Sequence, residues 1–167
     1  MTAAVSYASG PSDKALLGMP IGTLFDDIVA RHGGREAVVS VHQGIRLSYQ
    51  DLAQRVNTLA RAFIASGFNK GDRVGIWSPN NVEWLVTQYA TAKVGIILVT
   101  INPAYRLHEL AFVLEQSGCK GLVLQNQFKT SDYEALICEL CPQLESCEPG
   151  KLRSENFADL GLGISMT

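Results

Sequence analysis

The chain has 167 residues, of which 47% are hydrophobic and 18% charged, and this composition indicates a folded globular domain rather than a disordered chain. Its 14 basic and 16 acidic residues nearly cancel, so the charge gives no reason to expect nucleic acid or an anionic membrane as a partner. The longest apolar run without a charge, Val94 to Ile101, is too short to form a transmembrane segment.

The first twenty residues are rich in Gly, Pro and Ser and show no periodicity, so residues 1–20 are expected to form an extended arm. This stretch has neither the basic region nor the apolar region of a secretory signal. It also lacks the arginines of a mitochondrial presequence. A cytoplasmic location is therefore expected.

A helix and a hairpin are predicted next. The helix is expected to begin near Thr23, a good N-cap residue, and to end near His32, where two glycines follow. Two β-prone runs, Ala37–Val41 and Ile45–Leu47, are then separated by a short connection that contains Gly44. This spacing predicts a β-hairpin.

Ser48 opens the most regular helical pattern of the chain. Asp51, three residues later, completes an aspartate version of the capping box and suits the positive end of a helix. The following apolar residues recur at helical spacing and predict one buried stripe: Leu52, Val56, Leu59, Ala60 and Phe63. Gly67 is a natural end signal.

Strands and helices then alternate. Strands are predicted over Arg73–Trp77, Ile96–Ile101 and Gly121–Leu124, and helices over Asn81–Lys93, Leu107–Gln116 and Tyr133–Leu140. The second strand is almost wholly apolar, so it is expected to be buried on both faces of a parallel sheet. The order indicates an α/β fold, a mostly parallel sheet with helices on both faces, preceded by a helix and a hairpin.

The same pattern gives an expected organisation of the chain. After the arm, residues 21–142 are expected to form an α/β subdomain, and residues 143–167, which are polar and show no clear pattern, an irregular tail.

The four cysteines, Cys119, Cys138, Cys141 and Cys147, are expected to be reduced thiols. Cys138 and Cys141 form a CxxC pair, which raises the alternatives of a zinc or redox site. A zinc site needs four ligands, and the other cysteines do not supply a second pair. The pair also falls late in a helical pattern rather than at its start, so buried or half-buried thiols are favoured.

No sequence motif of a catalytic or nucleotide-binding site is present. The chain has no GxxxxGK[ST] phosphate loop, no GxGxxG between a strand and a helix, and no GxSxG nucleophile elbow. The histidines, His32, His42 and His108, fall at a helix end, a hairpin turn and a helix start, where solvated surface positions explain them. We therefore predict no catalytic residue and no metal ligand.

Two turns that follow predicted strands carry polar residues, Ser78–Asn81 and Thr100–Pro103. Ligands of open parallel sheets lie beyond the carboxyl ends of the strands. Asparagine in such turns usually satisfies the local backbone through its side chain. That structural role is favoured for Asn80 and Asn102, and ligand contact stays open as the alternative.

Three phrases in order resemble the AMP-forming acyl-CoA synthetases of the adenylate-forming superfamily. They are LSYQDL from Leu47, GFNKGDRVGIWSPN from Gly67, and ATAKVGIILVTINPAY from Ala90. Further segments, such as LLGMPIG from Leu16 and FKTSDY from Phe128, are similar to segments of the medium-chain fatty acyl-CoA synthetases of the acyl-CoA synthetase family member 2 type.

The resemblance implies the N-terminal part of the large domain of a ligase that uses ATP, Mg²⁺ and coenzyme A to turn a fatty acid into acyl-CoA through an acyl-adenylate. The family's phosphate loop, written TSGTTGxPKG, is not found in this sequence, nor are the later motifs. The chain is therefore expected to be an inactive fragment that binds none of these cofactors alone and self-associates through exposed apolar surface. The alternatives are a free-standing, non-catalytic α/β binding or assembly module and a flavodoxin-like nucleotide binder.

Overall fold

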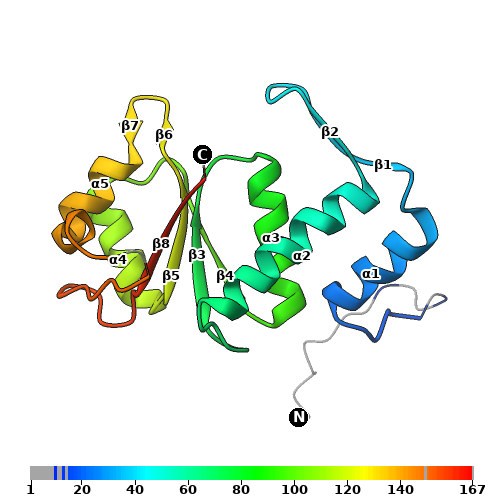
Figure 1. The fold of residues 1–167 in the computed structure, drawn as a ribbon, viewed down its shortest axis with the longest axis horizontal. Helices are drawn as coiled ribbons and strands as arrows, with labels where there is room; N and C mark the ends of the chain where they lie inside the picture. Colours follow the sequence, from blue (N-terminus) through cyan, green and yellow to red (C-terminus); the bar gives the residue numbers. More distant parts are fainter. Residues whose placement is uncertain (1–9, 11–12, 14, 149, 167) are drawn as a thin grey trace, which may run out of the picture.

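The computed structural model describes residues 10, 13, 15–148 and 150–166. Its centre is a sheet of four parallel strands in the order β4-β3-β5-β8, which Figure 1 shows between two layers of helices. The strands are β3 (Arg73–Trp77), β4 (Ile97–Ile101), β5 (Gly121–Gln125) and β8 (Leu162–Met166).

Each face of the sheet packs against its own helices. On one side α2 (Tyr49–Ala65) and α3 (Val82–Val94) enclose one hydrophobic core, with α1 (Ile21–His32) packed outside them. On the other side α4 (Leu107–Ser117) and α5 (Tyr133–Leu140) enclose a second core. The predicted α/β fold with helices on both faces is confirmed.

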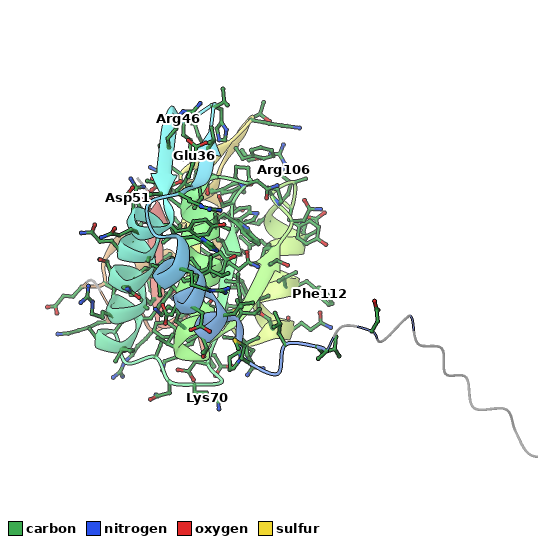
Figure 2. The ribbon with its side chains drawn as sticks, turned by 90° about the vertical axis from the view of Figure 1, so that its right-hand side faces the viewer. Glu36, Arg46, Asp51, Lys70, Arg106 and Phe112 are labelled. Atoms are coloured by element: carbon green, nitrogen blue, oxygen red, sulfur yellow. The ribbon has the colours of Figure 1, made fainter. Side chains whose placement is uncertain are left out.

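Smaller elements complete the chain. The predicted hairpin is present as β1 (Glu36–Ser40) and β2 (Ile45–Ser48), which pair antiparallel. The Arg46 guanidinium lies 2.7 Å from the Glu36 carboxylate across this hairpin (Figure 2). The sequence had not indicated a second hairpin, β6 (Gln127–Phe128) with β7 (Ser131–Asp132), or the short 3₁₀ helix η1 (Pro142–Glu145).

The start of α2 is held by the predicted capping box. The Ser48 hydroxyl accepts a hydrogen bond from the Asp51 backbone N–H at 3.1 Å, and the Asp51 carboxylate accepts one from the Ser48 N–H at 3.0 Å. The Ser48 hydroxyl also donates to the Asp51 carboxylate at 2.6 Å, and this bond, followed by that of the Ser48 N–H, holds the pKa of Asp51 below its ordinary value. Of the predicted stripe, four residues are buried and Leu59 is half-buried. Local sequence therefore fixes this helix, as expected.

The predicted N-cap of the first helix, Thr23, is wrong by three residues. Helix α1 begins at Ile21 with Pro20 at its N-cap, and no side chain caps it. Thr23 therefore lies inside the first turn. The Pro20 carbonyl accepts the first helical hydrogen bond, from the Leu24 N–H at 3.0 Å, so the first turn closes without a hydroxyl cap.

The expectation that the strand at Ile96–Ile101 is buried on both faces is also wrong. Strand β4 is an edge strand of the sheet, and Ile97 is 52% exposed. The central strands are β3 and β5, whose residues Val74, Ile76 and Leu122 are at most 1% exposed. An apolar, β-branched composition favours a strand, but the position within the sheet depends on its neighbours.

The stretch expected to be irregular, residues 143–167, contains the last strand of the sheet. Strand β8 pairs parallel with β5 from Leu162 to Met166. Its five residues include Gly163 and Ser165, which are poor strand formers, so propensity alone does not reveal it. Pairing with β5 stabilises this strand where the propensity of its own residues does not.

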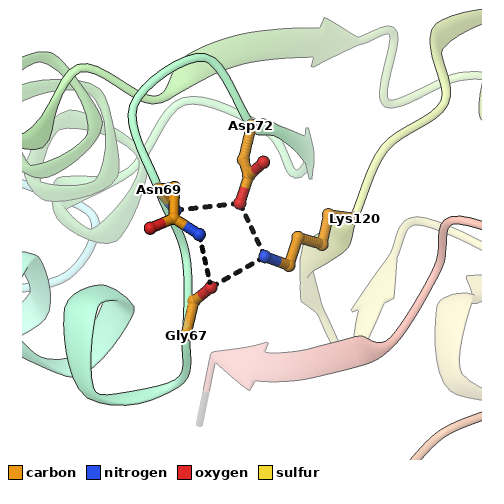
Figure 3. A network of polar contacts seen from close by, with 4 residues as sticks. All are labelled: Gly67, Asn69, Asp72 and Lys120. Atoms are coloured by element: carbon orange, nitrogen blue, oxygen red, sulfur yellow. Dashed lines mark hydrogen bonds and ion pairs between the residues drawn. The ribbon is translucent and has the colours of Figure 1, made fainter.

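A polar network fixes the loop before β3 at the amino end of the sheet, and Figure 3 shows its four residues. The Lys120 ammonium donates to the Gly67 carbonyl at 2.7 Å and pairs with the Asp72 carboxylate at 2.6 Å. The same carboxylate accepts from the Asn69 N–H at 2.9 Å. These bonds, that of Lys120 first, hold the pKa of Asp72 below its ordinary value. The network joins the start of β5 to the loop that follows α2.

Candidate functional site

In an open parallel sheet a ligand site is expected at the carboxyl edge. The chain passes from β3 to β4 on one side and then crosses to β5 on the other side of β3. The reversal of strand order therefore lies between β3 and β5. Open α/β sheets bind ligands at this point, beyond the carboxyl ends of the strands.

The side chain of Asn81 spans the gap between β3 and β5. Its amide donates to the Ser78 hydroxyl at 3.1 Å and to the Gln125 side-chain oxygen at 3.2 Å. Its own oxygen accepts from the Trp84 N–H at 2.7 Å and so caps α3. Both polar groups of this side chain are thus engaged in the fold, through three hydrogen bonds.

The two predicted asparagines differ in their surroundings. Asn102 turns back on the chain after β4, where its side-chain oxygen accepts from the Ala104 N–H at 2.9 Å. Asn80 is exposed beside Asn81. The structure brings neither of them into the Asn81 contact. A role for either in ligand binding stays an untested alternative.

Gln43, which the sequence did not single out, ties the hairpin to this edge. Its side-chain oxygen accepts from the Val82 N–H at 2.9 Å, in the first turn of α3, and from the Ser40 hydroxyl at 2.8 Å. Its amide donates to the Glu83 carboxylate at 2.8 Å. Gln43 therefore acts as a second cap for α3.

Ser40 and His42 form the one serine–histidine contact among the hydrogen bonds of the described residues, at 3.3 Å. A nucleophilic serine must donate its proton to the histidine. The Ser40 hydroxyl already donates to Gln43, so the His42 ring can only donate to it. This pair is therefore arranged for structure and not for nucleophilic attack.

An aromatic pair is buried at the carboxyl edge of the sheet. The Trp77 and Tyr133 rings stack with their centroids 3.6 Å apart and an interplanar angle of 10°, and both residues are fully buried. The Tyr133 hydroxyl donates to the Pro103 carbonyl, and its backbone N–H donates to the Asn126 carbonyl at 2.9 Å. Tyr133 therefore links the exits of β3, β4 and β5.

Burial raises the pKa of Tyr133 to about 12. An unfolded tyrosine titrates near pH 10, so the fold favours the protonated phenol. This contribution to stability is complete below about pH 10 and is lost as the pH rises towards 12. We expect the free energy of unfolding to fall over that interval, and to fall less in Tyr133→Phe, which cannot ionise. Urea unfolding of both proteins at a series of alkaline pH values measures the difference, and equal slopes would contradict it.

The cysteines are not placed for catalysis. Burial raises the pKa of the Cys119, Cys138 and Cys141 thiols, so these three remain protonated near neutral pH. All four cysteines are free, as expected from the sequence. Across the described part of the chain, no group of three His, Cys, Asp or Glu side chains is placed to hold a metal ion.

The carboxyl edge offers mainly neutral amides and hydroxyls that satisfy one another. Binding ATP requires a cradle of backbone N–H groups and cations for its phosphates. Two buried or half-buried ammonium groups are already paired elsewhere: Lys93 with Asp26 at 2.6 Å, and Lys120 with Asp72 at the opposite end of the sheet. Neither of these two ammonium groups is therefore free to contact phosphate at the carboxyl edge.

These features define a parallel α/β domain with helices on both faces of its sheet. The chain belongs to the AMP-binding enzyme family, which matches residues 25–158. Over 162 residues, 97% of this chain, it is 43% identical to the medium-chain acyl-CoA ligase ACSF2, mitochondrial, of Rattus norvegicus. The resemblance read from the three sequence phrases is confirmed.

Solved structures share the fold. A Mycobacterium tuberculosis fatty acyl CoA synthetase matches 88% of this chain with a TM-score of 0.73 at 23% identity. The long-chain-fatty-acid-CoA ligase FadD1 of Archaeoglobus fulgidus matches 96% with a TM-score of 0.73 at 21% identity. The chain spans 26% of the rat ligase, 26% of the mycobacterial protein and 30% of the archaeal one.

The comparisons leave the expected cytoplasmic location unconfirmed, because the rat relative is named as mitochondrial. Within the described residues, none of the helices has the length and apolar character needed to cross a membrane.

Proposed function

We propose that this chain is the N-terminal segment of a fatty acid–CoA ligase, which forms acyl-CoA, AMP and pyrophosphate from a fatty acid, ATP and coenzyme A through an acyl-adenylate. The observation that supports it most is the family match over residues 25–158, together with 43% identity to a medium-chain acyl-CoA ligase. The compartment, cytoplasmic on the sequence reading, stays a prediction.

The proposed role of these residues is to support an active site formed by other residues of the ligase. Adenylation turns a carboxylate, a poor electrophile, into an acyl group with a good leaving group, and the charge that develops on the phosphates needs cations and N–H donors. The sequence contains no phosphate loop that would form such a cradle, and the half-buried ammonium groups of Lys93 and Lys120 are engaged in ion pairs. ATP, Mg²⁺ and CoA therefore belong to the whole ligase in this proposal, and none to the chain alone.

Pyrophosphate exchange into ATP, measured with fatty acids of medium chain length, tests the proposal. We expect no fatty-acid-dependent exchange from the 167-residue polypeptide. We expect clear exchange from a polypeptide that continues in frame through a Thr/Gly-rich loop ending in Pro-Lys-Gly.

Two results would count against it. Adenylate formation by the 167 residues alone would show that the chemistry does not need the missing loop. A stop codon directly after Thr167 in the gene would favour the free-standing, non-catalytic module instead.

A further inference from the structure

The CxxC pair of the sequence, Cys138 and Cys141, lies at the end of α5. The Cys141 N–H donates to the Ile137 carbonyl at 2.8 Å, so the helical hydrogen bonds continue as far as Cys141. Residues three apart in a helix have Cα atoms about 5 Å apart. A disulfide bond needs a Cα separation of about 4.4–6.8 Å, so the backbone already holds the two cysteines within bonding range.

The two thiols differ in their exposure and lie close together. Cys141 is fully buried in the second core, whereas Cys138 is half-buried. Burial raises the pKa of the Cys141 thiol, the Ser154 hydroxyl lowers it, and the charge of an ionised Cys138 raises it again. Each thiol therefore lies within reach of the other's charge, and Cys138 is the one that solvent reaches first.

Cys141 also holds the segment that leads to β8, residues 150–161, which we call the α5–β8 segment. Its sulfur lies 3.5 Å from the Ser154 hydroxyl of that segment. The same hydroxyl accepts from the Phe157 N–H at 3.1 Å, and the Asn156 amide donates to the Leu140 carbonyl at 2.9 Å. The α5–β8 segment is thus fastened to the end of the helix that carries both cysteines.

We propose that Cys138 and Cys141 form a reversible disulfide bond and that its formation loosens the α5–β8 segment. The Cys138 thiolate attacks a small-molecule disulfide, such as oxidised glutathione, and displaces one thiolate, which takes up a proton. Cys141 then loses its proton, attacks the Cys138 sulfur of the mixed disulfide and displaces the second thiol. Two protein thiols are oxidised, and one small disulfide is reduced to two thiols. This reaction does not depend on the ligase activity proposed above.

The loosening follows from the direction in which Cys141 must move. In the reduced protein its sulfur is buried beside Ser154, whereas Cys138 lies on a more exposed side of the helix. Bonding to Cys138 gives up the contact with Ser154 and part of the burial of Cys141. A disulfide formed at such a cost is reduced more easily than a structural one, so an added thiol reverses it.

Oxidised glutathione, followed by proteolysis and mass spectrometry, tests the bond. The protein is expected to lose two hydrogen atoms. Cleavage after Glu139 and Glu145 separates Cys138, Cys141 and Cys147 into different peptides, and the first two are expected to stay joined until a reducing agent is added. Cys147→Ser is the matched control and should still form the bond, whereas Cys138→Ser should not.

Amide hydrogen exchange of the same samples tests the loosening. The Phe157 amide is expected to exchange at least about threefold faster in the oxidised wild type, and to return to its original rate on reduction. In Cys138→Ser, oxidised glutathione should leave this rate unchanged. Thermal unfolding shows whether Cys138→Ser is folded, and Cys138→Ala replaces it if it is not.

Nearby carboxylates give a further test of the order of attack. Burial raises the pKa of Cys138, and Glu145, Glu134 and Asp132 raise it further, so the reaction is slow near neutral pH. Glu145→Lys replaces an exposed negative charge by a positive one, and we expect it to speed the first step by about two- to threefold.

Any of four results would overturn the proposal. They are the absence of a bond between Cys138 and Cys141 at equilibrium, a bond from Cys141 to Cys147 in its place, a Cys138–Cys141 bond that leaves Phe157 exchange unchanged, and a first step that Glu145→Lys does not speed.

Discussion

Replacing Trp77 with alanine is expected to lower the free energy of unfolding by about 3–5 kcal/mol. The side chain is fully buried at the end of β3 and stacks on Tyr133, so truncation leaves a large cavity in the second core. Domains of this kind are stable by only about 5–15 kcal/mol, and the loss is a large part of that. Urea unfolding followed by circular dichroism measures it.

Two further variants make the result specific. Trp84→Ala removes the only other tryptophan, which is half-buried on α3, and should cost less. Trp77→Phe keeps a ring against Tyr133 and removes an indole N–H that has no hydrogen-bond partner, so it should cost less than alanine. Equal losses in Trp77→Ala and Trp84→Ala would show that the stacked pair is not the packing centre we describe.

The elements that could be predicted from the sequence are those with local signals. The capping box at Ser48 and Asp51 and the left-handed glycines Gly95 and Gly118 all lie within one turn of the boundary they set. The bounds of a helix that begins and ends at such signals can be predicted without knowledge of the elements that pack against it. Strand Arg73–Trp77 was likewise predicted with the bounds that the structure shows.

The position of each strand within the sheet could not be predicted, because it depends on residues far away in the chain. Strand β4 has the apolar composition of a central strand and lies at the edge, whereas β8 has a weak composition and still pairs with β5. Burial follows from which elements pack on a strand, and strand order depends on crossovers.

In the candidate site too, a role with a local signal could be predicted, and a contact between distant residues could not. Asn81 follows a strand in a Ser-Pro-Asn-Asn turn and caps the next helix, a role that its local sequence indicates. Gln43 reaches the same helix from a hairpin turn 39 residues earlier in the chain. No local pattern predicts that contact, so Gln43 was missed.

Replacing Gly22 with valine is expected to detach α1 from α3 and lower the free energy of unfolding by about 1–3 kcal/mol. A Cβ atom at this position would lie 2.9 Å from the Lys93 backbone Cα, which cannot move without shifting α3. The nearby stack of Phe25 on Tyr89, with ring centroids 4.5 Å apart, would open as well. Thermal unfolding gives the loss, and amide hydrogen exchange shows whether α1 opens on its own.

The direction of the Gly22 effect distinguishes packing from helix propensity. Valine has a better helix propensity than glycine by several tenths of a kcal/mol, so propensity alone would make the Gly22→Val protein slightly more stable. Gly18→Val, just before the helix, is the control for adding the side chain without a clash, because a Cβ atom there meets nothing within 4 Å. If Gly22→Val matches or exceeds the wild type in stability, the close approach of α1 to α3 does not exist in solution. If it is destabilised while Gly18→Val is not, the close approach of Gly22 to α3 helps to hold the helix against the domain.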